Sequence, residues 1–419
     1  MKNFFYAAVV MLLTTAYSYA GGYRVALQGN KQLAMGHTGV AIVNSAESVF
    51  FNPGALAFLE KKLNVSVGVS AVIANISFQN QQYGWYTETN HQTGTPFYAY
   101  GAFKINDWLT FGAGVYTPYG SSVEYPTNWE GSHLINNIEL AAIFIQPTLS
   151  AKVTDFLSIG AGPIYVTGNV NFNRNINRYL TNTAGERSNV TIDGTGITAW
   201  GYNVGAFLKV TDQINLGVNY RSKIEMKAEN KEAKFQNMPE SIAAGYQNTT
   251  FDATLPLPAE LTIGASYKIN EKWLVAFDYN QAYWDAYKSL DVYFSNGSSS
   301  INPRNYKNSS TYRLGAQYIV SPTVTLRGGY YFDESPVQEG YFAPETPRND
   351  SNNFTCGLTV NVTNSLAVDA SFLYVHFKEV DASYDYFTDP INPAAGYQSF
   401  GGTYKNNAFV PGIGVSYSF

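Results

Sequence analysis

The chain ends with the stretch FVPGIGVSYSF, residues Phe409–Phe419. Large residues alternate here with small or polar ones, which is the two-residue period of a β-strand. The large residues share one face: Phe409, Pro411, Ile413, Val415, Tyr417 and Phe419. A final strand with one apolar face and an aromatic last residue is typical of outer-membrane β-barrels, whose apolar face contacts lipid. The stretch therefore predicts an all-β barrel in a bacterial outer membrane.

The N-terminus has the features of a secretory signal peptide. Lys2 precedes an apolar run at 4–13, which is too short to span a bilayer as a helix, and small residues follow at 18–20. We expect residues 1–20 to be removed on export. No cysteine stands directly after the expected cleavage point, which argues against a lipoprotein.

Composition narrows the function classes. Charged residues make up 14% of the chain and aromatic residues 16%, whereas a soluble domain carries about 25% charged residues. The net charge is −5 and no basic block is present, so nucleic acid is not an expected partner. The lone Cys356 excludes an internal disulfide framework.

Enzymatic and cofactor-dependent functions find little support. The chain has four histidines, and none of them stands at a metal-binding spacing; a glycine-rich phosphate loop is also missing. His133 beside Ser132 is the only hint of a hydrolase, and adjacent side chains rarely point at each other. We therefore expect no enzyme activity, no cofactor and no metal.

Turn signals give the strand count. Six short polar turns occur, at 105–108, 153–156, 210–213, 269–272, 320–323 and 362–365. Seven longer loops alternate with them, near 76–95, 118–137, 175–198, 229–257, 286–301, 334–350 and 381–403. Together they join 14 antiparallel strands of a transmembrane barrel, with short periplasmic turns and long outer loops. Trp108, Phe156 and Trp273 lie beside short turns, where an interfacial aromatic girdle is expected.

The segment before the barrel does not alternate. The first strand begins near Leu63, so residues 61–419 are assigned to the barrel and 21–60 to a separate N-terminal segment. Its many apolar residues argue against an exposed periplasmic tail, and Pro53-Gly54 breaks any regular element. We therefore expect residues 21–60 to form a plug in the lumen.

Motifs in this segment resemble a known family. QGNKQLAMG (28–36), GVA (39–41) and AESVFFNPGAL (46–56) are similar to the N-terminal hatch of the FadL/TodX outer-membrane transporters of hydrophobic compounds. Similar motifs follow in order: YTPYG (116–120), YPTNWEG (125–131), LPAEL (257–261), YRLG (312–315), LRGGY (326–330), DESPV (333–337) and PETP (344–347). The resemblance thus covers the whole mature chain.

The resemblance implies a 14-stranded barrel, a hatch, and passive uptake of long-chain fatty acids or aromatic hydrocarbons. The ligand would pass from a groove in the outer loops to a lumen pocket, and movement of the hatch would open a lateral exit. The gating residues carried over to this chain are Phe50, Phe51, Asn52, Pro53 and Gly54. The chain has Asn52-Pro53-Gly54 where the family has Asn-Pro-Ala, and Ser132-His133 where a basic residue is usual.

Arg313 and Arg327 are candidate ligand contacts. Both face the lumen if Leu314 and Leu326 face lipid, and their strands are joined by one short turn. A carboxylate in an apolar pocket favours a guanidinium partner. The alternative is an internal ion-pair network with Asp278, Asp333 or Glu334.

Aromatic loop residues are candidates for an apolar groove. Trp85 and Trp284 lie in long loops, and Trp129 precedes Leu134 and Ile138, whose spacing suits a small loop helix. The alternative is loop packing or interface anchoring.

Long-chain fatty acids are thus the favoured ligands, with aromatic hydrocarbons as the alternative; a general diffusion porin or an adhesin is a more distant one. Outer-membrane lipids are expected around the barrel, and the barrel assembly machinery is expected to recognise the strand that ends at Phe419.

Overall fold

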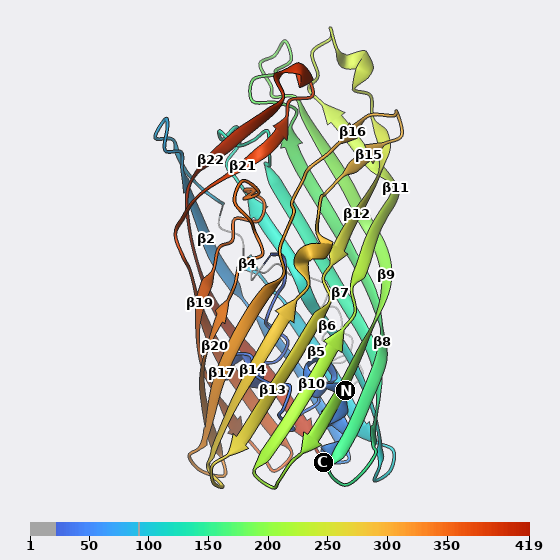
Figure 1. The fold of residues 1–419 in the computed structure, drawn as a ribbon, viewed down its shortest axis with the longest axis vertical. Helices are drawn as coiled ribbons and strands as arrows, with labels where there is room; N and C mark the ends of the chain where they lie inside the picture. Colours follow the sequence, from blue (N-terminus) through green and yellow to red (C-terminus); the bar gives the residue numbers. More distant parts are fainter. Residues whose placement is uncertain (1–21, 91–92) are drawn as a thin grey trace.

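The computed structural model describes residues 22–90 and 93–419, which form a closed barrel of 14 antiparallel strands (Figure 1). The predicted fold class is therefore confirmed. The expected signal peptide, residues 1–20, lies outside the described residues. In the part of the chain that is described, no helix is long and apolar enough to cross a bilayer.

Several barrel strands are split by bulges or short breaks. The first barrel strand consists of β1 (Leu63–Ser70) and β2 (Val72–Gln79). The second consists of β5 (Phe97–Lys104) with the short β3 (Tyr86–Glu88) and β4 (Thr93–Gly94). The next four are β6 (Leu109–Glu124), β7 (Asn137–Lys152), β8 (Leu157–Asn175) and β9 (Asn189–Lys209). Two further split strands follow: β10 (Ile214–Arg221) with β11 (Ile224–Gln236), and β12 (Thr249–Leu257) with β13 (Glu260–Lys268).

The second half of the barrel is more regular. It consists of β14 (Trp273–Ala282), β17 (Ser309–Ile319), β18 (Val324–Asp333), β19 (Ser351–Asn361), β20 (Leu366–Phe377) with β21 (Val380–Thr388), and β22 (Tyr397–Ser418). The loop between β14 and β17 carries β15 (Val292–Phe294) and β16 (Ser299–Ser300). Three outer loops contain short 3-10 turns: η3 (Ala243–Gly245), η4 (Trp284–Ala286) and η5 (Pro393–Ala395). The barrel closes where β1 pairs with β22, from Asn64 opposite Ser418 to Ser70 opposite Gly412.

All six predicted short turns lie between paired strands at the predicted residues. Most of the outer loops are shorter than predicted, because the strands continue past the membrane-facing band. The loop at 334–350 has its predicted bounds, and the loop after β14 is longer than predicted, at 283–308. The loop expected at 229–257 is reduced to 237–248, since β11 and β12 remain paired above the apolar band. Lys227 and Glu229 occupy the outward face there, so the hydrophobic alternation disappears although the backbone pairing does not.

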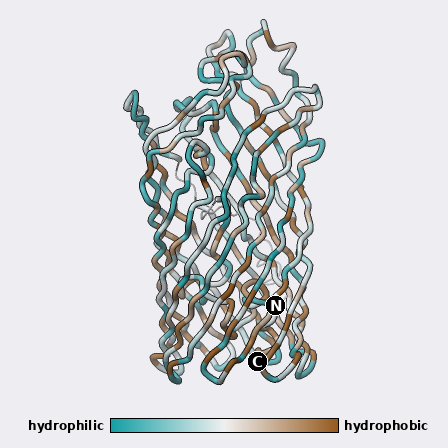
Figure 2. The backbone as a smooth tube through the Cα atoms, viewed as in Figure 1, coloured by the Kyte–Doolittle hydropathy of each residue, from teal (hydrophilic) through white to brown (hydrophobic). Residues whose placement is uncertain are grey.

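The outer surface has the apolar character expected of a lipid-facing wall. Figure 2 shows hydrophobic and hydrophilic residues alternating along the strands. In β22 the outward side chains are the large ones predicted from the sequence; Ile413 is 57% exposed and Phe419 56%. Trp108, Phe156 and Trp273 are also exposed beside their turns.

The N-terminal segment lies inside the lower part of the barrel, where Figure 1 draws it in blue. It contains α2 (Asn30–Leu33), α3 (Ser48–Phe51) and η2 (Pro53–Phe58), and nearly all of residues 22–59 are buried. Its contacts are with inward-facing groups of strands on several sides of the lumen.

Candidate functional site

An apolar pocket lies inside the barrel toward the outer loops. We call it the upper pocket; it holds about 580 Å³ of empty space, partly open to solvent. Its apolar walls come from the outer ends of β8 and β9 and from the loop after β14: Phe172, Val190, Ile192, Leu290, Val292 and Phe294. The alternation of β8 and β9 turns Phe172, Val190 and Ile192 inward. The pocket therefore suits a hydrocarbon chain or ring.

Two arginines lie in this apolar lining. Arg174 donates hydrogen bonds to the carbonyl of His133 (3.0 Å) and to Ser300 Oγ (3.0 Å), both of which are neutral acceptors. Arg304 instead forms an ion pair with Glu345. The charge of Arg304 is thus matched locally, whereas Arg174 is held by neutral groups. A carboxylate that entered the pocket would find Arg174 as a charge-assisted partner.

An aromatic cluster covers the upper pocket on one side. Trp129 stacks on Tyr125, with ring centroids 3.9 Å apart, and packs edge-on against Phe78 and Phe400. Leu134 and Ile138 belong to the same cluster, and Leu134 also lines the pocket. The structure therefore brings these three predicted residues together. The predicted loop helix is absent from residues 129–138, because Ile138 already pairs within β7.

The other two predicted tryptophans lie elsewhere. Trp85 stacks on Tyr83 in the first outer loop, and the guanidinium of Arg178 lies 5.1 Å from its ring centroid. Arg178 is also 5.9 Å from Phe400 of the aromatic cluster. Trp284 is fully buried and packs edge-on against Tyr23 (4.9 Å between centroids), deep below the loop surface.

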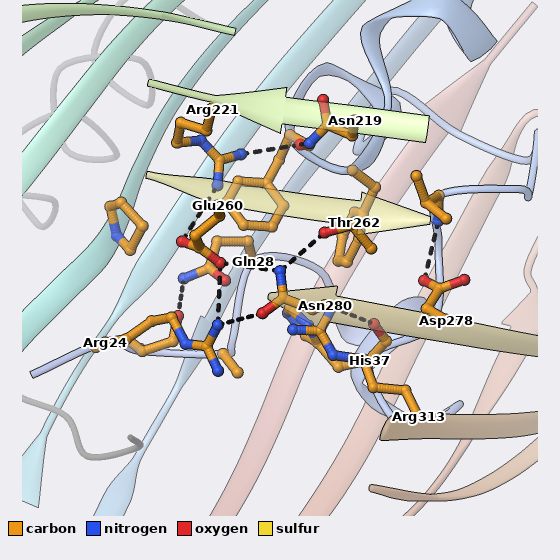
Figure 3. A pocket seen from close by; sticks show the side chains of 16 residues that line it. Arg24, Gln28, His37, Asn219, Arg221, Glu260, Thr262, Asp278, Asn280 and Arg313 are labelled. Carbon is orange, nitrogen blue, oxygen red and sulfur yellow. Dashed lines mark hydrogen bonds and ion pairs between the residues drawn. The ribbon is translucent and has the colours of Figure 1, made fainter. Parts of the chain in front are cut away.

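A polar cavity of about 420 Å³ lies deeper in the lumen (Figure 3). Glu260 is its central anion: it accepts from Arg24 at 3.0 Å and from the Tyr119 hydroxyl at 3.0 Å, and Arg221 lies 3.7 Å away. Arg313 also lines this cavity, opposite Asp278 on the neighbouring strand, and donates a long hydrogen bond (3.4 Å) to the carbonyl of His37.

The structure does not bring Arg313 and Arg327 into one site. Arg313 pairs in register with Tyr331 and Arg327 with Gln317, which separates the two arginines by about 14 Å along the hairpin. Arg327 donates to Gln317 (3.0 Å) and Thr359 (2.5 Å), outside both cavities described here. Of the proposed network partners, Asp278 lies opposite Arg313, whereas Asp333 pairs with Arg24 and Glu334 with Lys307.

The hatch residues taken over from the resemblance anchor the segment to the wall. Asn52 donates to the carbonyls of Val40 (2.7 Å) and Ala206 in β9 (2.9 Å), and its Oδ1 accepts from the amide of Gly54 (3.0 Å). Pro53 follows as the first residue of η2. The Phe50 carbonyl accepts from Arg221 (3.0 Å), and the Phe51 ring packs against His37 (4.9 Å).

One place in the wall is closed by the N-terminal segment itself. The ladder between β5 and β6 ends at Tyr98 opposite Tyr116, and a bulge follows at residues 117–118 of β6. Above it, Val25 donates to the Pro118 carbonyl (2.8 Å), and Gly120 donates to the Tyr23 carbonyl (2.9 Å). Residues 23–25 thus replace β5 as the neighbour of β6.

Sequence reasoning missed Arg24, Arg174 and Arg304. Arg174 had a readable signal, since it shares the inward register of Phe172 at the end of a long strand. Arg24 and Arg304 lie in irregular segments, where alternation gives no direction.

These features define an outer-membrane barrel filled by its own N-terminal segment, with an apolar pocket above it. The profile described as "Outer membrane protein transport protein (OMPP1/FadL/TodX)" matches residues 11–419. The chain therefore belongs to this family of outer-membrane transporters of hydrophobic compounds, as its motifs suggested.

Several relatives and solved structures are similar to this chain. Outer membrane protein P1 of Haemophilus influenzae is 24% identical, with 98% of each chain covered. The 47 kDa outer membrane protein of Pasteurella multocida is 24% identical, covering 86% of this chain and 88% of the relative. The crystal structure of a Pseudomonas aeruginosa FadL homologue superposes with a TM-score of 0.83 at 20% identity, covering 95% of this chain and all of the other. The Pseudomonas putida toluene transporter TodX gives a TM-score of 0.71 at 18% identity, covering 93% and 97%.

Proposed function

We propose that this protein passively takes up long-chain fatty acids, with Arg174 in the upper pocket as the contact for the ligand carboxylate. The observation that carries the proposal is a guanidinium in an apolar pocket whose acceptors are neutral. Burying a carboxylate in apolar surroundings is costly unless a charged partner compensates. Arg174 offers that partner, while the apolar walls accept the chain.

Buried apolar side chains connect the upper pocket with the wall beside β6, and we propose that the ligand follows this apolar path. Val190, Ile192 and Val292 of the pocket belong to the same buried cluster as Tyr23 and Tyr119 at the bulge. Below this level the lumen is polar around Glu260. A hydrocarbon chain avoids such a network, so the route that we propose turns sideways, through the part of the wall closed by residues 23–25.

The outer loops supply the proposed first contact. Trp85 and Arg178 lie together at the loop surface, and Arg178 connects them to the cluster around Trp129. A fatty acid could meet aromatic faces and a cation there before it enters the pocket. Arg313 remains a candidate for a deeper carboxylate contact, because it lines the polar cavity next to the apolar path.

Aromatic hydrocarbons are the second candidate ligands. The TodX neighbour is described as a toluene transporter, and Phe172 and Phe294 give the upper pocket aromatic walls. An uncharged ring would not need Arg174. A general diffusion porin is disfavoured, because buried side chains of residues 22–59 occupy the lower lumen.

The test is direct binding of palmitate and of butylbenzene to the purified barrel. Replacing Arg174 by Ala should weaken palmitate binding by about tenfold or more, since it removes a hydrogen-bonded charge partner, and should leave butylbenzene binding unchanged. Arg327→Ala is the matched lumenal control and should bind palmitate like the parent. Palmitate binding that ignores Arg174 but falls in Arg327→Ala would overturn the proposed contact. Binding of butylbenzene without palmitate would move the proposal to hydrocarbon uptake.

A further inference from the structure

The N-terminal segment has two parts that are held in different ways. We call residues 22–28 the strap and residues 30–59 the plug body. The strap carries the short pairing with β6, whereas the plug body lies deeper and contacts many strands. The lateral route proposed above passes through the place that the strap occupies.

Arg24 is the residue of the strap that spans the lumen. Its backbone forms a bridge with Tyr119 of β6, and its guanidinium reaches four consecutive strands of the opposite side. It donates to Glu260 of β13 (3.0 Å), Asn280 of β14, Thr311 of β17 (2.8 Å) and Asp333 of β18 (2.9 Å). The side chain is nearly fully buried, with 4% of the residue exposed.

The remaining polar contacts of the strap are few. Its ladder with β6 consists of the Val25 and Gly120 hydrogen bonds, and Gln28 adds a side-chain bond to the Thr117 carbonyl (3.1 Å). The Tyr23 hydroxyl donates to the Pro256 carbonyl. Arg24 therefore supplies the only ion pairs from the strap to the barrel among the described residues.

We infer that Arg24 is a latch: a positioning residue whose ion pairs and hydrogen bonds keep the strap in the wall and the lateral route closed. Two of its acceptors are carboxylates, and a planar guanidinium can serve all four acceptors at once. An ammonium is a point charge and cannot reproduce this fork. This inference rests on the proposed lateral route, but the latch can be measured without any ligand.

The acceptors do not depend wholly on Arg24. Glu260 keeps the Tyr119 hydroxyl and Arg221, and Asp333 keeps the Thr311 hydroxyl at 2.6 Å. Loss of the Arg24 side chain therefore leaves the barrel-side network with other partners. The expected effect is release of the strap rather than collapse of the barrel.

The experiment uses single reporter cysteines in the full-length protein with Cys356→Ala. Ala26→Cys reports on the strap and Ala57→Cys on the plug body; both alanines are buried. The rate of labelling by a water-soluble maleimide is compared with and without Arg24→Ala. We expect Ala26→Cys to react about tenfold faster or more once the latch is removed, and Ala57→Cys to keep its parent rate. In Arg24→Lys, the labelling rate of Ala26→Cys should lie between the rates measured with Arg24 and with Arg24→Ala.

A second variant covers the case in which Arg24→Ala does not fold. Asn280→Ala combined with Thr311→Ala removes two acceptors from the barrel side and should raise strap labelling to a smaller extent. An unchanged rate at Ala26→Cys in the folded variants, or an equal rise at both reporters, would overturn the latch.

Palmitate then separates the latch from the proposed function. Saturating palmitate should accelerate labelling of Ala26→Cys when Arg24 is present and should add little in Arg24→Ala. If palmitate does not bind the parent protein, the proposed fatty-acid function fails, while the ligand-free labelling rates still decide the latch.

Discussion

The strap and the plug body share one lumen, yet the barrel holds them by different means. The main chain of the plug body accepts or donates hydrogen bonds with side chains from strands around the lumen: Ser150, Ser158, Ser266, Asp278 and Thr355. The strap is held by the Arg24 side chain, by a two-bond ladder, and by single side-chain hydrogen bonds from Tyr23 and Gln28. Many independent contacts make a segment hard to move, whereas a segment whose ion pairs come from one side chain can be released when that side chain lets go. We infer that only the strap moves during transport.

Close contact with the wall distinguishes the plug body further. The ideal Cβ position of Gly160 in β8 lies 2.4 Å from the carbonyl carbon of Pro53, and that of Gly217 in β10 lies 2.0 Å from the Val40 carbonyl oxygen. Only glycine permits this approach. The backbone of the plug body therefore packs directly on the backbone of the wall.

Gly160→Val should give the largest effect. The new side chain would meet the backbone of Pro53, which has no flexible end to yield, so we expect a loss of about 3 kcal/mol in stability or failure of the plug body to seat. The measurement is the heating temperature at which the barrel changes from its folded to its unfolded migration on a denaturing gel. Gly101→Val is the matched control, since a Cβ at Gly101 meets nothing within 4 Å. Equal unfolding temperatures for the two variants would contradict direct backbone packing.

Asn52→Ala should give the next largest loss of stability. It removes the donor shared by the Val40 and Ala206 carbonyls and the acceptor of the Gly54 amide, at a cost of about 2 kcal/mol. Urea unfolding of the purified barrel measures the loss. Asn364→Ala, in an exposed periplasmic turn, should change little. If Asn52→Ala matched that control, the assignment of Asn52 as an anchor would be wrong.

Trp284→Ala should loosen the strap without unlocking it. The indole packs on Tyr23 and fills the space beside Gly22, but the latch at Arg24 remains. Labelling of Ala26→Cys should therefore rise less than in Arg24→Ala. Trp85→Ala removes a partly exposed ring from an outer loop and should leave strap labelling unchanged; a rise in this control would argue against a local effect.

A further prediction concerns the pH dependence of stability. His133 lies in an outer loop with its ring against Phe387 and Phe400, and burial together with Arg178 and Arg174 lowers its pKa to about 3. The ordinary value is near 6.5. Between about pH 3 and pH 6.5 the His133 ring therefore binds a proton in the unfolded loop but not in the folded loop. Stability from this site is complete above about pH 6.5 and falls as the pH drops toward 3. Trp129 fluorescence should report this loss, and His133→Phe should remove it.

The sequence was informative wherever one face of the chain met lipid. The alternation in β22 and the polar turns predicted the barrel and its strand count, because a lipid-facing wall imposes a two-residue period. The upper parts of β11 and β12 were missed, since their outward face carries charged residues such as Lys227 and Glu229 and the lipid-facing apolar period is lost.

The candidate site was less predictable for a related reason. The alternation along its strand predicted that Arg313 faces inward. Its distance from Arg327, however, depends on the register of the hairpin, which the alternation does not give. Arg174 obtains its neutral surroundings from Ser300 and from the loop at His133, which are far away in sequence. Arg24 acts across the lumen, on strands that local patterning cannot relate to it.

In the mechanism that we propose, transport requires the strap to leave β6. The most direct test joins the bridged pair covalently, with Arg24→Cys and Tyr119→Cys in the Cys356→Ala background, and follows palmitate transfer into vesicles that contain the barrel. We predict no transfer while the disulfide is intact, with palmitate binding to the upper pocket retained, and recovery of transfer after reduction. Equal transfer by the oxidised and reduced forms would show that the strap does not have to leave β6.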